Sequence, residues 1–232
     1  MSPHAPGALR RTSTFSPFSQ SFRRVPGEGP EGVCDCMLIG ERPGQEESRR
    51  GRPFVGPSGL YLDTCLNVAN LTRSSIYITN LVKTFNQYGK PTPEDIAADH
   101  DELVLEILTH DPRVIGLVGG WAVEAVLGRE HAEMEKVHGV PLLVRELFGG
   151  ELTFSSLTSA RTEDVGAVDG WLVLPMMHPA NCIYSPEVMG AVLDDFLRLA
   201  QLLEGEIGPI EDEVMVPDYR IVTGDEVGRL LP

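Results

Sequence analysis

The sequence contains little cysteine and no long hydrophobic run. Its 232 residues include only four cysteines, which are too few and too scattered for the disulfide framework of a small secreted domain. No stretch approaches the 18 or so consecutive apolar residues of a membrane-spanning helix, and the N-terminus lacks the apolar core of a secretory signal. We therefore expect a cytoplasmic protein without membrane association. The 42% share of hydrophobic residues is that of an ordinary globular chain.

Positive charge is also scarce. The chain has 34 acidic residues against 19 lysines and arginines, and its net charge is −15. This balance argues against a protein that coats nucleic acid through bulk electrostatics. Residues 1–30 carry a small positive excess and residues 204–232 are acidic, so the middle of the chain retains a net charge of −12. Any contact of this middle region with DNA must be local and small.

The composition divides the chain into three parts. Residues 1–30 are rich in serine, proline, glycine and arginine without apolar periodicity, which predicts a disordered basic arm. Residues 31–205 have the alternating pattern of one folded domain, and residues 206–232 form an acidic C-terminal tail.

Short apolar runs alternate with helical patterns in the middle region. Runs of the kind that form buried strands stand at 33–39, 76–79, 114–118 and 171–177, and helical patterns follow at 57–69, from Thr92, at 121–127 and from Ser185. Residues 129–170 are less regular, with a hairpin expected around 140–144. This order predicts an α/β fold of three layers, α/β/α, around a central, mostly parallel four-stranded sheet.

Three polar residues stand at the ends of predicted strands: Glu41, Asn80 and His178. Ligands of such sheets bind at the carboxyl ends of the strands, so residues far apart in the sequence are expected to meet at one edge. Each also has a purely structural interpretation, as a turn residue, a loop-binding amide or an edge histidine. Phe54 could equally be a core aromatic, and Glu46 and Glu47 a solvated pair.

Taken together, these residues match a known pattern. Residues 40–47 read G-E-R-P-G-Q-E-E, 51–59 read G-R-P-F-V-G-P-S-G, 77–83 read Y-I-T-N-L-V-K, and 178–180 read H-P-A. Over about 34–204 the chain resembles the family 4 uracil-DNA glycosylases of the uracil-DNA glycosylase superfamily. The resemblance implies the fold predicted above and an enzyme that flips uracil out of DNA.

The resemblance also implies roles for single residues. Glu41 and His178 would be catalytic, and the DNA wedge loop would comprise Pro179, Ala180, Ile183 and Tyr184. The substrate-binding residues would be Gly40, Arg42, Glu47, Phe54 and Asn80.

These residue types suit the reaction. A flipped base needs a snug pocket and a stacking face, here Phe54. Asn80 would present its amide to O4 and N3–H of uracil, a pattern that cytosine reverses. His178 would donate to O2, where negative charge grows as the glycosidic bond breaks. Glu41 would orient water or stabilise the cationic sugar, and Glu47 would help to exclude a 5-methyl group.

The sequence departs from the family at several places. The family's iron–sulfur cluster requires four cysteines, but Thr84 and Asp99 stand where the third and fourth would be, and no Cys-x-x-Cys lies upstream. We therefore predict no cluster and no metal. Arg42 replaces a small residue or glutamine, and would either grip a phosphate or obstruct the pocket. The wedge loop lacks the family's arginine.

The leading prediction is a monofunctional uracil-DNA glycosylase of base excision repair, acting as a monomer on uracil-containing DNA. The first alternative is an inactive accessory module of the same fold, blocked by Arg42, that binds DNA or a replicative polymerase. Residues 217–227 weakly resemble the entry to the proofreading domain of A-family DNA polymerases, which makes a polymerase a candidate partner. The second alternative is a nucleotide-binding enzyme, although no G-x-G-x-x-G motif is present.

Overall fold

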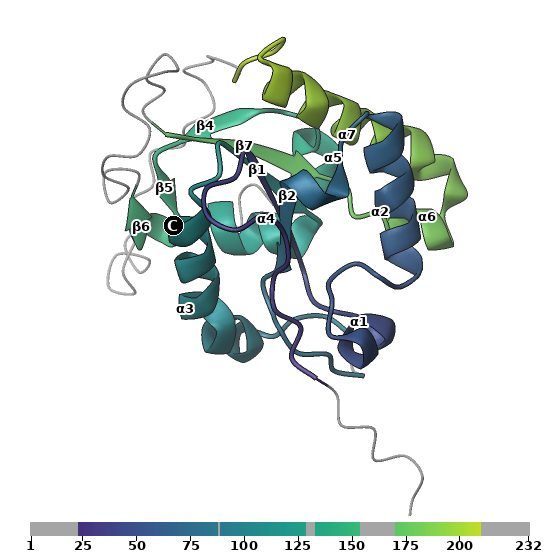
Figure 1. The fold of residues 1–232 in the computed structure, drawn as a ribbon, viewed down its shortest axis with the longest axis vertical. Helices are drawn as coiled ribbons and strands as arrows, with labels where there is room; N and C mark the ends of the chain where they lie inside the picture. The colour runs from purple at the N-terminus through teal and green to yellow at the C-terminus, as the bar shows by residue number, and fades with distance from the viewer. Residues whose placement is uncertain (1–22, 88, 129–132, 154–169, 210–232) are drawn as a thin grey trace, which may run out of the picture.

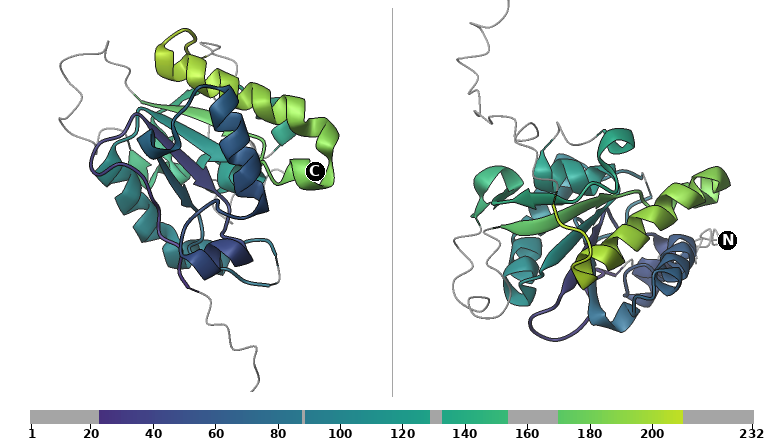
Figure 2. Two further views of the ribbon diagram at one scale, coloured as in Figure 1. Left: turned by 45° about the vertical axis from the view of Figure 1, so that its right-hand side comes forward. Right: turned by 90° about the horizontal axis from the view of Figure 1, so that it is seen from above.

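The computed structural model describes residues 23–87, 89–128, 133–153 and 170–209. These residues form a five-stranded sheet between two layers of helices (Figures 1 and 2). The strand order is β2-β1-β3-β7-β4. Within the described ranges, no helix is both long enough and apolar enough to cross a bilayer.

Four strands of this sheet run parallel and the fifth is antiparallel. The strands are β1 (Cys36–Gly40), β2 (Ile76–Asn80), β3 (Val114–Val118), β4 (Leu142–Val144) and β7 (Trp171–Met176), with a separate pair β5 (Glu146–Leu147) and β6 (Leu152–Thr153). The predicted mostly parallel α/β/α architecture is confirmed. The four-stranded sheet is extended by β4, which pairs with β7, while the local hairpin lies at β5 and β6 rather than at 140–144.

Helices follow the parallel strands in turn. The α-helices are α1 (Gln45–Arg50), α2 (Pro57–Val68), α3 (Pro93–His110), α4 (Gly120–Leu127), α5 (Met134–Val137), α6 (Asn181–Tyr184) and α7 (Met189–Glu204), and the 3₁₀ turns are η1 (Arg73–Ser75), η3 (Phe148–Gly150) and η5 (Pro186–Val188). Thr92 and Asp95 form a reciprocal capping box at the start of α3, as the Thr-Pro-Glu-Asp sequence predicts.

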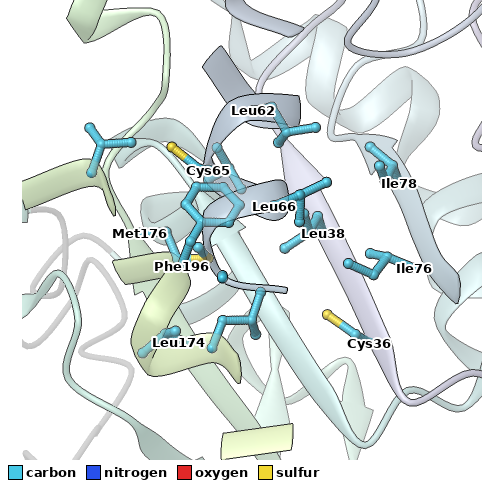
Figure 3. Packing of buried hydrophobic residues seen from close by; sticks show 14 of the residues in the cluster. Cys36, Leu38, Leu62, Cys65, Leu66, Ile76, Ile78, Leu174, Met176 and Phe196 are labelled. Carbon is cyan, nitrogen blue, oxygen red and sulfur yellow. The ribbon is translucent and has the colours of Figure 1, made fainter. Parts of the chain in front are cut away.

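Two hydrophobic layers flank the sheet, because successive strand residues point to opposite faces. Leu38 and its neighbours pack beneath α2 and α7, where Phe196 fills the centre (Figure 3). Met37 and Ile39 face the other way, toward α3 and α4. The first strand begins at Cys36 rather than at residue 33, since Val33 is 63% exposed and lies outside the core.

Residues 23–30 are part of the fold, although they were predicted to belong to the disordered arm. They run along the free edge of β2, where Glu28 and Ile78 exchange both backbone hydrogen bonds at 2.9 and 2.8 Å. Arg24 donates to the buried Asp99 of α3 at 2.7 Å. The described fold thus includes residues before 31, while residues 1–22 and most of the acidic tail lie outside the described residues.

Removing this N-terminal contact is expected to destabilise the fold. Asp99→Ala should lower the free energy of unfolding by about 2 kcal/mol, because it removes the buried carboxylate that binds Arg24 and leaves the buried Lys83 amide without its 2.6 Å acceptor. Arg24→Ala should lower it by about 1 kcal/mol, since the arginine is half exposed. Urea unfolding measures both values, with Arg23→Ala as the charge-matched control. Equal midpoints for all variants would show that the contact contributes nothing.

Candidate active site at the carboxyl ends of the strands

At the end of β1, the backbone of Gly40 packs closely against the side chains of Asn80 and Phe54. A Cβ atom placed on Gly40 would lie 2.5 Å from Asn80 Oδ1 and 2.6 Å from Phe54 Cζ. No real side chain tolerates such distances, so glycine is the residue that lets Asn80 and Phe54 approach β1.

Phe54 is fixed in an unusual backbone conformation. Its φ of +48° lies in the left-handed region, which is uncommon for a bulky residue and must be supported by its surroundings. Glu47 supplies this support, because its Oε1 accepts the Val55 and Gly56 amides at 3.0 and 2.7 Å. Arg73 holds the other side by donating to the Phe54 carbonyl at 3.2 Å. Glu47 is therefore buried in a structural bond network, not solvated.

Asn80 ends β2 with its side chain almost fully buried, at 2% exposure. The buried Lys83 ammonium holds the backbone beneath it, donating to Asn80 O at 2.9 Å and to Thr79 Oγ1 at 2.6 Å. Glu106 of α3 balances the lysine charge at 2.7 Å. This network leaves the Asn80 amide group facing the pocket with its backbone immobilised.

His178 follows β7 and stacks with Phe54, with ring centroids 5.7 Å apart and an interplanar angle of 24°. The Ala180 amide donates to His178 Nδ1 at 3.0 Å. Burial lowers the pKa of His178 to about 4, so the imidazole is neutral at pH 7. Because Nδ1 accepts a hydrogen bond, the single ring proton is assigned to Nε2.

Two adjoining pockets share His178. The first, here called the Phe54 pocket, is lined by Arg42, Pro43, Gly44, Glu47, Phe54, Ser58, Asn80 and His178. The second, here called the Glu41 pocket, is the roomier of the two, with a cavity volume of about 180 Å³, and is lined by Glu41, Gly119, Gly120, Met134, Met177, His178, Ala180 and Asn181. A planar, hydrogen-bonding ligand suits the first pocket, which has an aromatic wall and an amide.

Glu41 reaches across the sheet edge to the start of α4. Its Oε1 accepts the Trp121 amide at 3.2 Å, and a Cβ on Gly119, whose φ is +102°, would lie 2.3 Å from that oxygen. Burial raises the pKa of Glu41, while the Trp121 amide and the Lys90 charge counteract the rise.

Comparison with known proteins identifies this arrangement. The family model of the uracil DNA glycosylase superfamily matches residues 26–200, most of the chain. The chain belongs to the uracil DNA glycosylase superfamily. The four strand ends that form the two pockets all lie within the matched residues.

Several relatives carry the name of one branch of this superfamily. The type-4 uracil-DNA glycosylase of Archaeoglobus fulgidus is 29% identical over 183 residues, covering 77% of this chain and 81% of the relative. That of Thermotoga maritima is 29% identical over 181 residues, covering 76% and 82%. A type-5 enzyme of Thermus thermophilus matches over a shorter segment, 45% of this chain and 54% of the relative, with 35% identity. The predicted closeness to family 4 is supported.

The chain's cysteines do not fit the iron–sulfur cluster of family 4. Cys36, Cys65 and Cys182 are buried in the layer under α2 and α7, whereas Cys34 packs on the opposite face. Burial raises the pKa of Cys65 to about 11, which disfavours the thiolate that a cluster requires. In the described part of the chain, no three histidine, cysteine or acidic side chains gather in a way that could hold a metal ion.

Asp99 and Thr84 occupy the places of two cluster cysteines in the resemblance. Asp99 accepts the Lys83 amide at 2.6 Å and binds Arg24. Thr84 is exposed. At this place the described residues form hydrogen bonds and an ion pair, and no cysteine is among them.

Arg42 binds protein acceptors rather than filling the pocket. Its guanidinium donates to the carbonyls of Gly89 and Lys90, at 2.9 and 3.2 Å, and to Asp95 Oδ2 at 3.0 Å. Neither expectation for this side chain, a phosphate grip or an obstruction, matches this geometry. The guanidinium points into the loop before α3, and the rest of the side chain lines the pocket.

The residues expected to wedge DNA lie beside His178. Pro179 and Ala180 form the turn into α6, and Ile183 and Tyr184 on that helix are 40% and 84% exposed. Exposed apolar and aromatic side chains next to a pocket are suited to entering a base stack. Their role in DNA binding stays a prediction.

Part of the Glu41 pocket escaped the sequence analysis. Gly119 and Gly120 form part of its wall, the Trp121 amide beside them holds Glu41, and Asn181 lines the pocket from α6. The signal was available, since Gly119 directly follows β3 and the strand-end rule applies to every parallel strand.

The pKa of Glu41 predicts an acid limit for activity. If the carboxylate acts in the reaction, kcat should fall as the pH drops through the raised pKa of Glu41, since burial favours the protonated form. His178, with a pKa of about 4, should not limit activity above pH 5. A pH profile of single-turnover rates measures this limit.

The variant Glu41→Gln tests the assignment of that limit. It should lower the rate about 10²-fold and remove the acid limb that Glu41 causes. Because the folded pKa is raised, the ionised carboxylate destabilises the fold at pH 7, so this variant should unfold at an equal or higher urea concentration than the wild type. An unchanged acid limb would assign the titration to another group.

Proposed function

We propose that this chain is a uracil-DNA glycosylase that hydrolyses the N-glycosidic bond of deoxyuridine in DNA and leaves an abasic site for base excision repair. The observation that carries the proposal is the convergence of Phe54, Asn80 and His178 on one pocket. The relatives named uracil-DNA glycosylases support it.

Base selection follows from the amide of Asn80. Its NH₂ group donates to O4 of uracil and its carbonyl accepts from N3–H. Cytosine has a donor at position 4 and an acceptor at N3, so each amide atom would face a like group. Leaving both unpaired in a buried pocket costs about 1–3 kcal/mol each. Phe54 would stack on the face of the base.

Bond cleavage follows from the neutral His178. The bond between C1′ and N1 breaks with both electrons moving to the base, and negative charge accumulates at O2. The Nε2–H group donates a hydrogen bond to that oxygen, and this bond strengthens as the charge grows. Water adds to C1′ of the cationic sugar and loses one proton, which the departing uracil anion takes up through solvent. Glu41 in the adjoining pocket orients the water or stabilises the cation.

Glu47 would contribute to selection against thymine. Its Oε1 is bound to the Val55 and Gly56 amides, and its Oε2 faces Gly44, where a Cβ would lie 2.7 Å away. A carboxylate held this rigidly in the pocket wall would leave little space for a 5-methyl group.

A monofunctional mechanism is favoured by the surroundings of the lysines. A lyase needs a free amine at C1′ to form a Schiff base. The Lys83 ammonium is buried among three oxygen acceptors, and Lys136 pairs with Glu133. Lys90 Nζ lies 5.9 Å from the Trp121 ring centroid, and neither pocket is lined by a lysine.

The sequence alone supports the proposals for location, oligomeric state and partners. We propose a cytoplasmic monomer that acts on uracil-containing DNA, and the polymerase partner stays a prediction because residues 217–227 lie outside the described residues.

The test is incubation of the purified chain with single- and double-stranded oligonucleotides that carry one uracil, followed by alkali. Strand breaks at uracil after alkali, with none in thymine-only DNA and none before alkali, support a monofunctional glycosylase. Absence of breaks from folded protein would contradict the proposal and favour the inactive accessory module. A complex trapped by borohydride would contradict the monofunctional mechanism alone.

A further inference from the structure

A glycosylase of this charge needs a dedicated contact to the DNA backbone. The middle of the chain has a net charge of −12 and the wedge loop contains no arginine. Many arginines of the described ranges already face carboxylates, among them Arg24, Arg49, Arg50, Arg52 and Arg73. These arginines are therefore already engaged, and a cation without a carboxylate partner is better suited to hold a phosphate near the flipped nucleotide.

Lys90 lies next to the Glu41 pocket and is exposed. Its Nζ lies 5.9 Å from the centroid of the Trp121 ring, and the Trp121 amide is the donor that holds Glu41. The lysine is close enough to Glu41 to oppose the rise in its pKa. Among the described residues, no carboxylate lies within ion-pair distance of Lys90.

Hydrogen bonds from Arg42 hold the backbone at Lys90. One guanidinium nitrogen binds two successive carbonyls, Gly89 O and Lys90 O, and another binds Asp95. The Arg42 side chain is only 8% exposed. Asp95 is in turn held by the Thr92 amide at 3.1 Å in the capping box of α3. The Lys90 backbone is therefore tied through Arg42 to the capped first turn of α3, and binding a ligand there requires little further ordering.

We propose that Lys90 binds a backbone phosphate of the DNA strand that carries the flipped nucleotide, and that Arg42 is a positioning residue that holds Lys90 for this contact. The inference rests on the proposed function, because it takes uracil-containing DNA as the ligand. A phosphate beside the Glu41 pocket is where the strand must pass if its base occupies the Phe54 pocket. Cation–π attraction at an exposed site is weak, so the ammonium can turn from Trp121 to a phosphate.

The test measures binding to an oligonucleotide with an abasic-site analogue by fluorescence anisotropy over a range of NaCl concentrations. Lys90→Ala should raise Kd about fivefold to tenfold and reduce the salt slope by close to one ion. In turnover it should raise KM more than it lowers kcat. Lys90→Arg should restore both Kd and slope. Lys136→Ala, which removes an equal charge on α5, should behave as the wild type.

Arg42→Met tests the positioning role, since methionine retains an unbranched chain but lacks the guanidinium. It should weaken binding and reduce the salt slope even though Lys90 is present. The Kd of the double variant should then stay within about twofold of the Kd of Lys90→Ala, because both changes remove the same phosphate contact. Additive losses would overturn the positioning role.

Failure of this inference is distinguishable from failure of the proposed function. A wild-type chain that releases uracil, together with a Lys90→Ala variant of unchanged Kd and salt slope, would overturn the phosphate contact alone. A wild-type chain that releases no uracil, yet binds DNA with a Lys90-dependent salt slope, would overturn the glycosylase and retain the contact.

Discussion

The His178→Ala variant is expected to cleave uracil from DNA about 10²–10³-fold more slowly than the wild type, with little change in Kd for DNA. The reason is that the hydrogen bond from Nε2 to O2 strengthens only as the glycosidic bond breaks, so its loss affects the transition state more than the bound substrate. Burial that lowers the pKa of His178 to about 4 makes the neutral ring the active form. Single-turnover rates at saturating enzyme measure the effect.

A change of leaving group separates this role from a structural one. An electron-withdrawing fluorine at C5 stabilises the departing base anion, so DNA with 5-fluorouracil should depend less on His178. The rate loss of His178→Ala should therefore be smaller on that substrate than on uracil. His110→Ala is the control, because that ring stacks on Tyr77 and lines neither pocket. Equal losses on both substrates would mean that His178 does not act at O2.

The strand-end rule predicted the meeting of Asn80 and His178 well. Asn80 ends β2 and His178 comes shortly after β7, two parallel strands that β1 and β3 separate in the sheet, and both side chains line the Phe54 pocket. Glu41 lies at the same edge, as expected, and lines the adjoining pocket, which shares His178. The sequence did not predict that the Trp121 amide, a backbone donor at the start of α4, would hold its carboxylate. Backbone donors are the same in every residue, so a sequence pattern does not reveal where they point.

Glu47 and Arg42 illustrate the same limit for charged side chains. Their sequence context allowed a solvated glutamate and a pocket-filling arginine, and both are buried against backbone groups. Glu47 accepts two amides of the loop that follows α1, and Arg42 donates to two carbonyls of the loop before α3. These partners lie 8 to 48 positions away in the chain, and only the folded loops bring them within reach.

The N-terminal boundary shows where composition misleads. Residues 23–30 look like the rest of a proline-rich and glycine-rich arm, yet Val25 is 1% exposed and donates to Lys83 O at 2.7 Å. The glycines serve close packing here, since a Cβ on Gly29 would lie 2.6 Å from Tyr77 Cα. A segment that adds to a sheet edge gains its stability from the strand it pairs with. Its own sequence pattern therefore does not predict that it is folded.

The second large effect is expected for Asn80→Asp. The substitution keeps the size of the side chain and replaces the NH₂ donor by an acceptor, so O4 of uracil would face a carboxylate oxygen. Two buried acceptors that face each other weaken binding by several kcal/mol. Sites that lose such a complementary hydrogen bond typically discriminate about 10⁴-fold. Uracil release should fall by at least two orders of magnitude, measured as a single-turnover rate.

The same variant tests the source of base selection, because an acceptor at this position is complementary to the amino group of cytosine. The ratio of cytosine to uracil release should rise even if both rates are low. The folded state should persist, since the backbone of residue 80 is held by Lys83 through its carbonyl and not through the side chain. Asn67→Asp on the exposed side of α2 controls for the added charge. An Asn80→Asp variant that retains wild-type uracil release would show that the amide does not read the base, and selection would then fall to Glu47 and Phe54.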